Sequence, residues 1–352
     1  MLAKKDRRLV GEAVDRLITV PMSNWAILVG LPIVKLYEAT REKVGEPLTI
    51  YAAEKLADAV KPGDIVIVTT GFIVPTVLEG ETDGPIGAAA LARSIDVGLQ
   101  ASPVMITEEV LTEMLRATCQ AAGLHPFKHK KVAERPRRVA VEGFPVDPDE
   151  AERAACKMLE DLNPSAIISI ERPGYNEKGI YHSGGGIDIT SFTAKIDYLV
   201  DEAKSRGILT IGIGDLGNEL GMGHILDDVK RLVPWATKCK CPCRGGIASA
   251  AATDVLIVAT VSNWGAYGLE ACLATVLAEP EVMHDMTTEK LLLKTSVLAG
   301  AIDSVSGLSR PAVDGVSEEI NAYLIELLRN IIQMKLKENM FTKEYRKALK
   351  KM

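Results

Sequence analysis

Short runs of apolar, β-branched residues recur along this 352-residue chain, and each is followed by a longer segment with helical spacing. These runs stay apolar throughout instead of alternating with polar residues, a pattern typical of strands that are covered on both faces. The strand candidates are residues 64–70, 103–107, 138–143, 166–171, 209–215 and 254–260. Alternating strands and helices imply right-handed crossovers and a mainly parallel sheet. The sequence therefore predicts an α/β fold: a mainly parallel sheet flanked by helices in Rossmann-like layers.

Helical spacing of apolar residues fills the segments between these runs. The helix candidates are residues 85–99, 107–122, 147–162, 191–205, 225–233 and 266–278, with a docked terminal helix from Ser317 onward. A basic, proline-interrupted segment at 127–138 suggests an N-terminal α/β half over residues 1–135 and a C-terminal α/β half over 136–352. Charge runs are usually solvated surface, so two sub-domains and one continuous domain both stay open.

Composition limits the classes of partner. The chain is 47% hydrophobic and 25% charged, as in ordinary globular proteins, and its formal net charge of −6 disfavours nucleic acid or an anionic membrane as the main partner. The most apolar long stretch, residues 245–261, is interrupted by Asp254 and falls short of a membrane span. The first residues are charged and amphipathic, unlike a secretory signal. A chain of this size can fold without disulfide bonds, so its six cysteines are expected to be reduced. We therefore expect a cytoplasmic protein that acts on a small molecule. A homo-oligomer is also expected, although composition does not indicate it.

Four of the predicted strands run into loops rich in glycine and polar residues. These loops span residues 70–88, 171–188, 214–223 and 262–268. In open parallel sheets, ligands bind beyond the carboxyl ends of the strands. The site is therefore expected where these four loops meet.

Glu81 and Asp83 precede a Gly-Pro pair and an alanine-rich helix. Both carboxylates then face the positive end of a helix dipole, which favours the ionised form that a hard-cation ligand needs. The simpler interpretation is that Asp83 is an N-cap. A cap explains one carboxylate and leaves the second unexplained, so the pair is interpreted as a metal site.

The loop at 214–223 combines four glycines with Asp215, Asn218 and Glu219. Glycines let backbone N–H groups approach a bound anion, and the three polar side chains follow one another within about one turn. A dinucleotide-binding fingerprint is disfavoured because Asp215 stands where a phosphate would lie, so no nucleotide cofactor is expected. The alternative is a strained turn that begins a helix.

Two further strand ends carry candidate binding residues. Arg172 is suited to hold a substrate carboxylate with two parallel hydrogen bonds, or it forms a salt bridge with Glu171 or Asp188. Asn263 and Trp264 begin the last helix before the C-terminal segment. Trp264 either lines the pocket or packs as a hydrophobic staple.

Cys239, Cys241 and Cys243 are separated by single residues. Zinc sites prefer two residues between paired cysteines, and no second pair follows. This spacing favours a loop without metal. His182 and His224 flank the acidic loops, and a lone histidine is more often structural.

Five motifs occur in order at the four loops: TGFxxP from Thr70, ETDGPxGAxxLA from Glu81, SIERPG from Ser169, GIGDxGNExGMG from Gly212 and VSNWGxY from Val261. Together they resemble the D-glutamate cyclase family over about residues 17–278. The resemblance implies an α/β fold, conversion of D-glutamate to 5-oxo-D-proline with loss of water, and a divalent metal, Mn²⁺ or Mg²⁺, at the acidic loops.

Under this resemblance each candidate residue takes a role. Glu81, Asp83 and Asp215 are expected to hold the metal, and the catalytic residues are Glu219 for proton transfer, Arg172 for the α-carboxylate and Asp188 for the ammonium group. The remaining candidates bind substrate: Gly71, Glu171, Gly186, Asn218, Asn263 and Trp264. Two rivals use the same loops, a Mg²⁺- or Mn²⁺-dependent hydrolase of a small phosphorylated metabolite and a non-catalytic metabolite sensor.

Overall fold

The computed structural model describes residues 3–22, 33–127, 136–336, 345 and 347–350. A seven-stranded sheet with every neighbouring pair parallel lies at its centre, in the order β5-β6-β4-β1-β7-β8-β9. Its strands are β1 (Ile65–Thr70), β4 (Ser102–Glu108), β5 (His125–Phe127), β6 (Arg138–Phe144), β7 (Ala166–Ile170), β8 (Leu209–Gly214) and β9 (Val255–Val258). The predicted α/β fold with a mainly parallel sheet is confirmed, and only the short edge strand β5 has no counterpart among the predicted strands.

Helices precede the first strand, fill most of the connections between strands and follow the last strand. Their bounds are α1 (Lys4–Ile18), α3 (Ile33–Val44), α4 (Leu48–Ala59), α5 (Pro85–Ser94), α6 (Thr112–Ala121), α7 (Pro148–Leu162), α8 (Ile196–Ser205), α9 (Leu226–Leu232), α10 (Ser262–Leu277), α11 (Met286–Leu298) and α12 (Glu318–Leu336). Short helical turns are η1 (Ile95–Leu99), η2 (Glu109–Leu111), η4 (Gly223–Ile225) and η5 (Pro280–Val282), and two antiparallel hairpins pair β2 (Ile73–Val74) with β3 (Glu79–Gly80) and β10 (Ala312–Val313) with β11 (Val316–Ser317).

The strand order reverses at β1. From β1 the chain builds outward through β4 to β6, then returns to the opposite side of β1 and continues through β7, β8 and β9. Counting only these six strands, this is the order of doubly wound α/β folds. Such a reversal leaves a crevice at the carboxyl ends of the two central strands, here β1 and β7.

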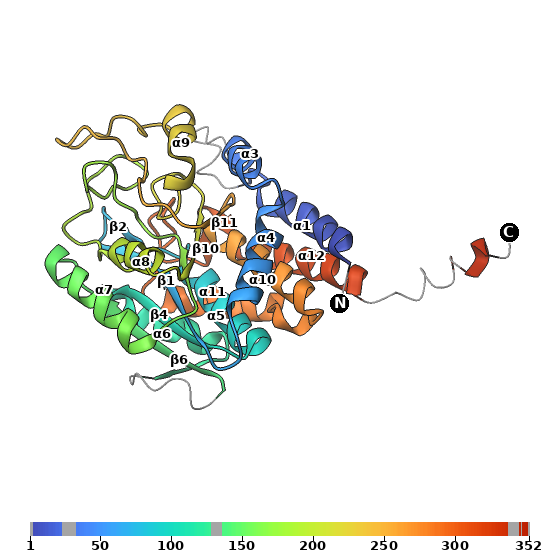
Figure 1. Cartoon of the computed structure of the whole chain (residues 1–352). Helices are drawn as coiled ribbons and strands as arrows, with labels where there is room; N and C mark the ends of the chain where they lie inside the picture. Colours follow the sequence, from blue (N-terminus) through green and yellow to red (C-terminus); the bar gives the residue numbers. More distant parts are fainter. Residues whose placement is uncertain (1–2, 23–32, 128–135, 337–344, 346, 351–352) are drawn as a thin grey trace.

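Helices cover both faces of the sheet (Figure 1). Val66 and Val68 of β1 belong to the larger core, which they share with helices α4, α5 and α10. Ile67, between them, points to the other face and joins a second core with α7 and α8. All three side chains are fully buried, which explains why the strand reads as an unbroken apolar run.

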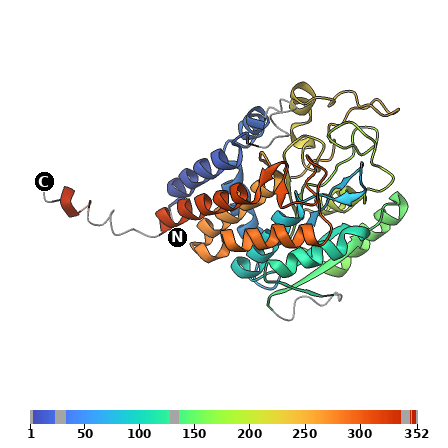
Figure 2. The same ribbon diagram turned by 180° about the vertical axis from the view of Figure 1, so that it is seen from behind.

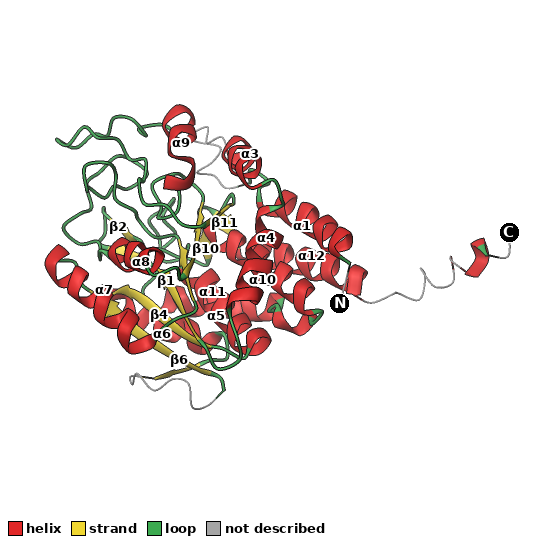
Figure 3. Cartoon of the chain, viewed as in Figure 1, coloured by secondary structure: helices red, strands yellow, loops and turns green. Residues whose placement is uncertain are grey.

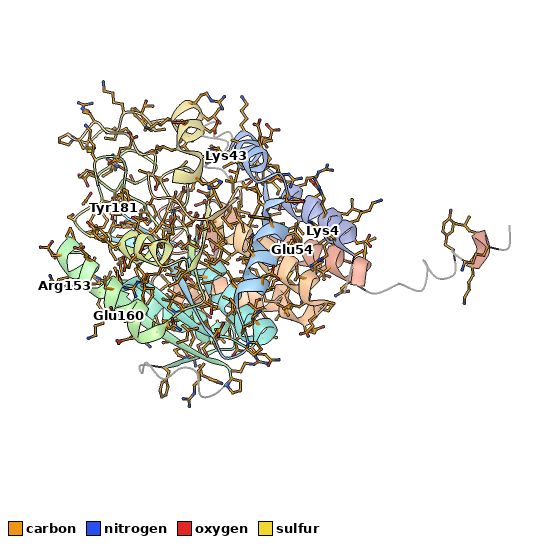
Figure 4. The ribbon with its side chains drawn as sticks, viewed as in Figure 1. Lys4, Lys43, Glu54, Arg153, Glu160 and Tyr181 are labelled. Carbon is orange, nitrogen blue, oxygen red and sulfur yellow. The ribbon has the colours of Figure 1, made fainter. Side chains whose placement is uncertain are left out.

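Helix α7 illustrates how these layers form. The Asp147 side chain accepts a hydrogen bond from the amide of Glu150 and caps the helix, and Pro148 occupies its first turn. Ala151 and Leu159 are buried against the sheet, whereas Arg153 and Glu160 face outward (Figure 4). The amphipathic spacing of the sequence thus sets which face meets the sheet.

The terminal helix α12 packs against α1, α10 and α11, as the view from behind shows (Figure 2). Its predicted docking is confirmed. Among the described residues, we find no helix with the length and apolar character needed to cross a bilayer.

Long loops gather at one end of the sheet (Figure 3). Two of them, residues 171–195 and 233–254, are far longer than ordinary connections in compact domains.

Strands from both predicted halves share the one sheet, since β1, β4 and β5 precede residue 135 and the other four follow it. Residues 128–135 of the basic segment lie outside the described residues, and the division at 135 stays a prediction.

Candidate active site

A cavity of about 200 Å³ opens at the carboxyl ends of the central strands. Acidic side chains, small loop residues and a few apolar side chains form its wall. They are Phe72, Val74, Pro75, Thr76, Glu81, Glu171, Ser183, Gly184, Gly185, Asp215, Leu216, Asn218, Ser304, Val305 and Asp314. The cavity lies where the strand order reverses. Three of the four predicted loops (70–88, 171–188 and 214–223) contribute to its wall, whereas no residue of the loop at 262–268 does.

Asp83 and Asn263 join two helix N-termini at the edge of this cavity. The Asp83 carboxylate accepts hydrogen bonds from the amides of Ser262 (2.9 Å) and Asn263 (2.8 Å), which begin α10. The Asn263 side-chain oxygen in turn accepts from the amides of Gly84 (2.9 Å) and Gly87 (2.7 Å) at the start of α5. Each helix is therefore capped by a residue from the other segment. Asp83 is therefore not the N-cap of the helix that follows it, since Gly84 holds that position in α5; its carboxylate caps α10 instead.

Glu171 follows β7 directly and lines the cavity. Its backbone φ is +46°, a left-handed conformation that costs energy for a residue with a side chain. The Ser262 hydroxyl donates a hydrogen bond to its carboxylate. Strained backbones cluster at functional sites, so Glu171 is a stronger candidate for chemistry than its predicted binding role implies.

Asp314 is a site residue that the sequence analysis missed. It lies in the two-residue turn between β10 and β11, where Asp314 (φ +49°) and Gly315 (φ +76°) both adopt left-handed conformations. An Asp-Gly pair between short apolar runs is a strong hairpin signal. The signal was available, but nothing in it indicates that the turn folds back onto the sheet.

Asp83, Asp215 and Asp314 converge, with one carboxylate oxygen of each within 4.8 Å of the others. Glu171, Asp215 and Glu219 form a second group that meets the same limit. Of the predicted metal ligands, Asp83 and Asp215 are brought together. Glu81 lines the same cavity but lies outside both groups.

Burial and mutual repulsion act together on these carboxyls. Burial, followed by the charge of Asp314, raises the pKa of both Glu81 and Asp83 well above the usual range. Burial and the charge of Glu219 do the same to the pKa of Glu171, and burial and the charge of Glu171 to that of Asp215. Burial raises the pKa of Asp314 to about 6. Such displaced pKa values are typical of catalytic and metal-binding sites.

Glu219, the predicted proton-transfer residue, is fully buried and bound to its own loop. Its carboxylate accepts hydrogen bonds from the amides of Leu216 (2.8 Å) and Gly217 (2.6 Å), with a longer contact to that of Asp215 (3.4 Å). It does not line the cavity. This geometry supports a role in shaping the loop that carries Asp215.

Arg172 does not fit the predicted role of holding a substrate carboxylate. Its side chain is completely buried and forms an ion pair with Glu108 (2.6 Å). The guanidinium also donates to the carbonyls of Gly71 and Ala194. Its partner is Glu108 and not Glu171 or Asp188, and its terminal nitrogens are already engaged. Arg172 therefore links β4 and β7 to the loop that follows β1 and to the loop that precedes α8.

Other predicted binding residues also lie outside the cavity wall. Gly71 has a φ of +113°, and a Cβ there would meet the Thr107 hydroxyl at 2.5 Å, so the position requires glycine for packing. Asp188 is exposed and accepts from the amide of Thr190 in a local turn. Trp264 donates from its ring nitrogen to Asn321 within the large core.

Asn218 lines the cavity and has a free acceptor. Its side-chain nitrogen donates to the backbone carbonyl of His182 (2.9 Å), which orients the amide. Its side-chain oxygen is buried and has no hydrogen-bond partner among the described residues. A buried acceptor without a partner costs free energy, so this oxygen is suited to a ligand N–H. Its predicted place in substrate binding fits this geometry.

The convergent carboxylates fit a divalent metal. Mg²⁺ and Mn²⁺ prefer oxygen ligands, and carboxylates forced together raise each other's pKa unless a cation balances them. Among the described residues that line the cavity there is no lysine or arginine to do so. Asp83, Asp215 and Asp314 are therefore the candidate ligands.

Comparisons with known proteins show which family this chain resembles. A family model described as "D-glutamate cyclase-like, C-terminal" matches residues 36–329, most of the chain. A Homo sapiens protein named "D-glutamate cyclase, mitochondrial" is 30% identical over 223 residues, which cover 60% of this chain and 33% of the human protein. The match thus spans about a third of the length of that relative.

Proposed function

The chain belongs to the D-glutamate cyclase family, and from that premise we propose that it is a lyase that converts D-glutamate to 5-oxo-D-proline and water. The observation that carries this proposal is the convergence of Glu171, Asp215 and Asp314 on one cavity, beside the unpartnered acceptor of Asn218. The acidic side chains suit a bound cation, and the free acceptor suits an amine.

The reaction joins the two ends of one molecule. The substrate nitrogen, after losing a proton, forms a bond to the γ-carboxyl carbon, and one oxygen of that carboxyl leaves as water. The cavity contributes by holding the substrate folded, so that nitrogen and carbon stand at reacting distance. Phe72 and Val305 supply apolar wall against which the substrate's methylene groups pack.

Glu171 is our candidate for proton transfer. A carboxyl whose pKa is raised by burial accepts a proton from an ammonium group more readily and returns it to a departing hydroxide near neutral pH. Asn218 is positioned to accept a hydrogen bond from the same ammonium group, through its free oxygen. A divalent cation held by Asp83, Asp215 and Asp314 would neutralise the γ-carboxylate and polarise its carbonyl.

A metal-dependent hydrolase of a phosphorylated metabolite is the alternative. It needs cationic or amide donors for the phosphate, yet no Lys or Arg occurs among the described residues of the cavity wall. A phosphate ester also lacks the ammonium group that an acidic cavity attracts. A sensor without catalysis is the third reading of the same site.

One incubation separates these functions. Purified protein with Mn²⁺ or Mg²⁺ is given D-glutamate, L-glutamate or a panel of sugar and nucleotide phosphates, and products are identified by mass spectrometry. We expect loss of one water from D-glutamate and much slower conversion of L-glutamate. Phosphate release without lactam formation would favour the hydrolase, and binding without any product would favour the sensor.

We also propose a reducing compartment such as the cytoplasm. All six cysteines are free thiols, and three of them lie close enough to one another to oxidise. Fractionation of cells that express the tagged chain tests this compartment.

A further inference from the structure

Four soft metal ligands meet at one point outside the acidic cavity. The sulfur of Cys239 lies 3.4 Å from that of Cys241 and 3.3 Å from that of Cys243. The Nε2 atom of His182 lies 3.2 Å from the Cys241 sulfur and 3.5 Å from the Cys243 sulfur. The four ligand atoms all lie within 4.8 Å of one another. His182 is distant in the sequence, which is why cysteine spacing alone disfavoured a metal here.

These separations suit a shared ion better than a disulfide. Bonded sulfurs lie about 2.05 Å apart. Two thiolates on a tetrahedral zinc ion, each about 2.3 Å from the metal, lie about 3.8 Å from each other. The observed sulfur–sulfur distances are much nearer the second value.

The backbone around the cluster supports thiolates. The amide of Gly245 donates to the Cys243 sulfur (3.3 Å), and the side chain of Asn176 reaches the same sulfur (3.8 Å). Gly246 has a φ of +81°, and a Cβ there would collide with the Ala236 carbonyl. The loop is thus folded tightly around its sulfurs. Hydrogen bonds of this kind are the outer-shell support that metal ligands usually have.

The cluster also joins the two longest loops of the fold. His182 belongs to residues 171–195, and the cysteines belong to residues 233–254. Neither loop contains a long helix or strand, so little regular structure holds the two together. Direct contact between them includes a backbone hydrogen bond from Lys240 to Gly186 (3.1 Å). Predicted substrate-binding residue Gly186 therefore contacts the cysteine loop.

We propose that His182, Cys239, Cys241 and Cys243 bind a structural zinc ion. Three thiolates and one imidazole complete a tetrahedral shell and leave no open position, which is the arrangement of structural rather than catalytic zinc. Soft sulfur ligands separate this site from the all-oxygen cluster at the cavity, which suits a hard cation. The two sites would therefore hold different metals in the same chain.

This zinc site supports the wall of the cavity. Ser183 and Gly184 line the cavity directly after His182 in the sequence. The His182 carbonyl accepts the hydrogen bond that orients Asn218. An ion that fixes His182 therefore fixes both the backbone of this wall and the side-chain amide of Asn218, which lines the cavity. The metal site itself does not depend on the proposed reaction.

Metal content of the intact protein tests the proposal. The chain is purified under reducing conditions with no chelating tag, and its metals are measured by mass spectrometry. We expect about one zinc per chain, and cobalt substitution should give the visible absorption of a tetrahedral thiolate site. A protein that carries no zinc and takes up neither zinc nor cobalt overturns the proposal, as does an iron–sulfur absorption spectrum.

Variants locate the ion. Cys243→Ser should lose most of the zinc, whereas Cys156→Ser, a half-buried cysteine on α7 outside the cluster, should retain it. If Cys243→Ser does not fold, native mass spectrometry of the wild-type chain still reads the stoichiometry, and thiol labelling before and after zinc removal reads the ligands. Equal zinc loss in both variants, or unchanged labelling of the three clustered cysteines after zinc removal, would contradict the assignment.

Discussion

Glu171 combines a strained backbone with a carboxyl whose pKa is raised by burial. Replacing it with glutamine keeps the size of the side chain and its capacity to accept from Ser262 but removes proton transfer. We expect Glu171→Gln to lower turnover of D-glutamate by roughly 10²–10⁴-fold, the usual effect of losing a general acid–base group. Steady-state kinetics together with the melting temperature separate this loss from unfolding.

Glu219→Gln provides the matched comparison. Its carboxylate accepts hydrogen bonds from amides of its own loop, and an amide nitrogen in place of one oxygen leaves an N–H donor without an acceptor. We expect a loss of stability of about 1–3 kcal/mol. A variant that keeps full stability and loses turnover as strongly as Glu171→Gln would return the proton-transfer role to Glu219.

Arg172 and Glu108 form a buried pair whose role can be measured as stability. Arg172→Ala leaves the Glu108 charge buried without its partner, so we expect the free energy of unfolding to fall by about 3–5 kcal/mol. The double variant Arg172→Met with Glu108→Leu removes both charges and should recover part of that loss. Urea unfolding of the three proteins measures the difference. A stable Arg172→Ala protein with only a raised KM would restore the predicted substrate-binding role.

Replacing Asp314 tests which carboxylates bind the proposed metal ion. If Asp83, Asp215 and Asp314 share a cation, Mn²⁺ at about 100 times its dissociation constant should stabilise the protein by about 2.7 kcal/mol. Asp314→Asn should lose most of this stabilisation, and Asp227→Asn, an exposed aspartate on α9, should keep it. Thermal melting across a metal titration measures both. An equal response in the two variants would exclude Asp314 from the metal site.

At the scale of elements, the strands were predictable because each carries its own signal. Burial on both faces leaves β1, β7 and β8 with apolar residues interrupted only by Thr, Ser or Gly, and local sequence suffices to find them. The start of α10 was placed four residues late. No side chain next to it caps that terminus, and its cap is Asp83, brought from another segment. Helix ends that depend on distant residues cannot be read from local pattern.

A second element-scale feature is the buried histidine between α10 and α11. His284 lies 2.7 Å from the Glu270 carboxylate and 3.1 Å from that of Glu289. Burial opposes its charge, but the two carboxylates outweigh burial and raise the pKa of His284 to about 9. The protonated ring therefore links these helices.

The sign of the pH dependence follows from this shift. A pKa of about 9 in the folded protein and about 6.5 in the unfolded chain means that the stabilisation is complete below about pH 6.5. It is lost as the pH rises through about 9, and its full size is about 3 kcal/mol. Urea unfolding between these limits should show this fall. His284→Gln should remove it, and His125→Gln, at an exposed position on β5, should not. A flat wild-type profile would contradict the ion pair.

For the whole molecule, we propose that exposed apolar side chains on α11 and α12 mark the face through which copies associate. Leu298 on α11 and Tyr323 and Leu327 on α12 are exposed, and the two helices pack side by side. We expect the wild-type chain to form the predicted homo-oligomer through this face, because association would remove these exposed apolar side chains from water. Light scattering after size-exclusion chromatography should give a multiple of the chain mass. Leu327→Glu should reduce it, whereas Val110→Glu, at an exposed position on η2, should not.

The position of the site was predictable from the sequence, because the carboxyl ends of parallel strands meet at one edge. The roles of individual residues were not. Arg172 follows a strand end as a substrate-binding arginine would, but its guanidinium group forms an ion pair with Glu108. A local pattern indicates the turn at Asp314, but no local pattern places that turn beside the acidic cluster or His182 beside the cysteines. Residue type predicts what chemistry is available, and tertiary packing decides which residues are free to perform it.

The paired caps of Asp83 and Asn263 have a consequence for the order in which the molecule is made. Their hydrogen bonds join positions between 176 and 180 residues apart. During synthesis, α5 leaves the ribosome long before the residue that completes its N-terminus exists. Contacts of such long range form late because closing the intervening chain costs entropy. A nascent chain can therefore assemble much of its sheet while the acidic pocket is still open, and the pocket closes only after α10 has emerged.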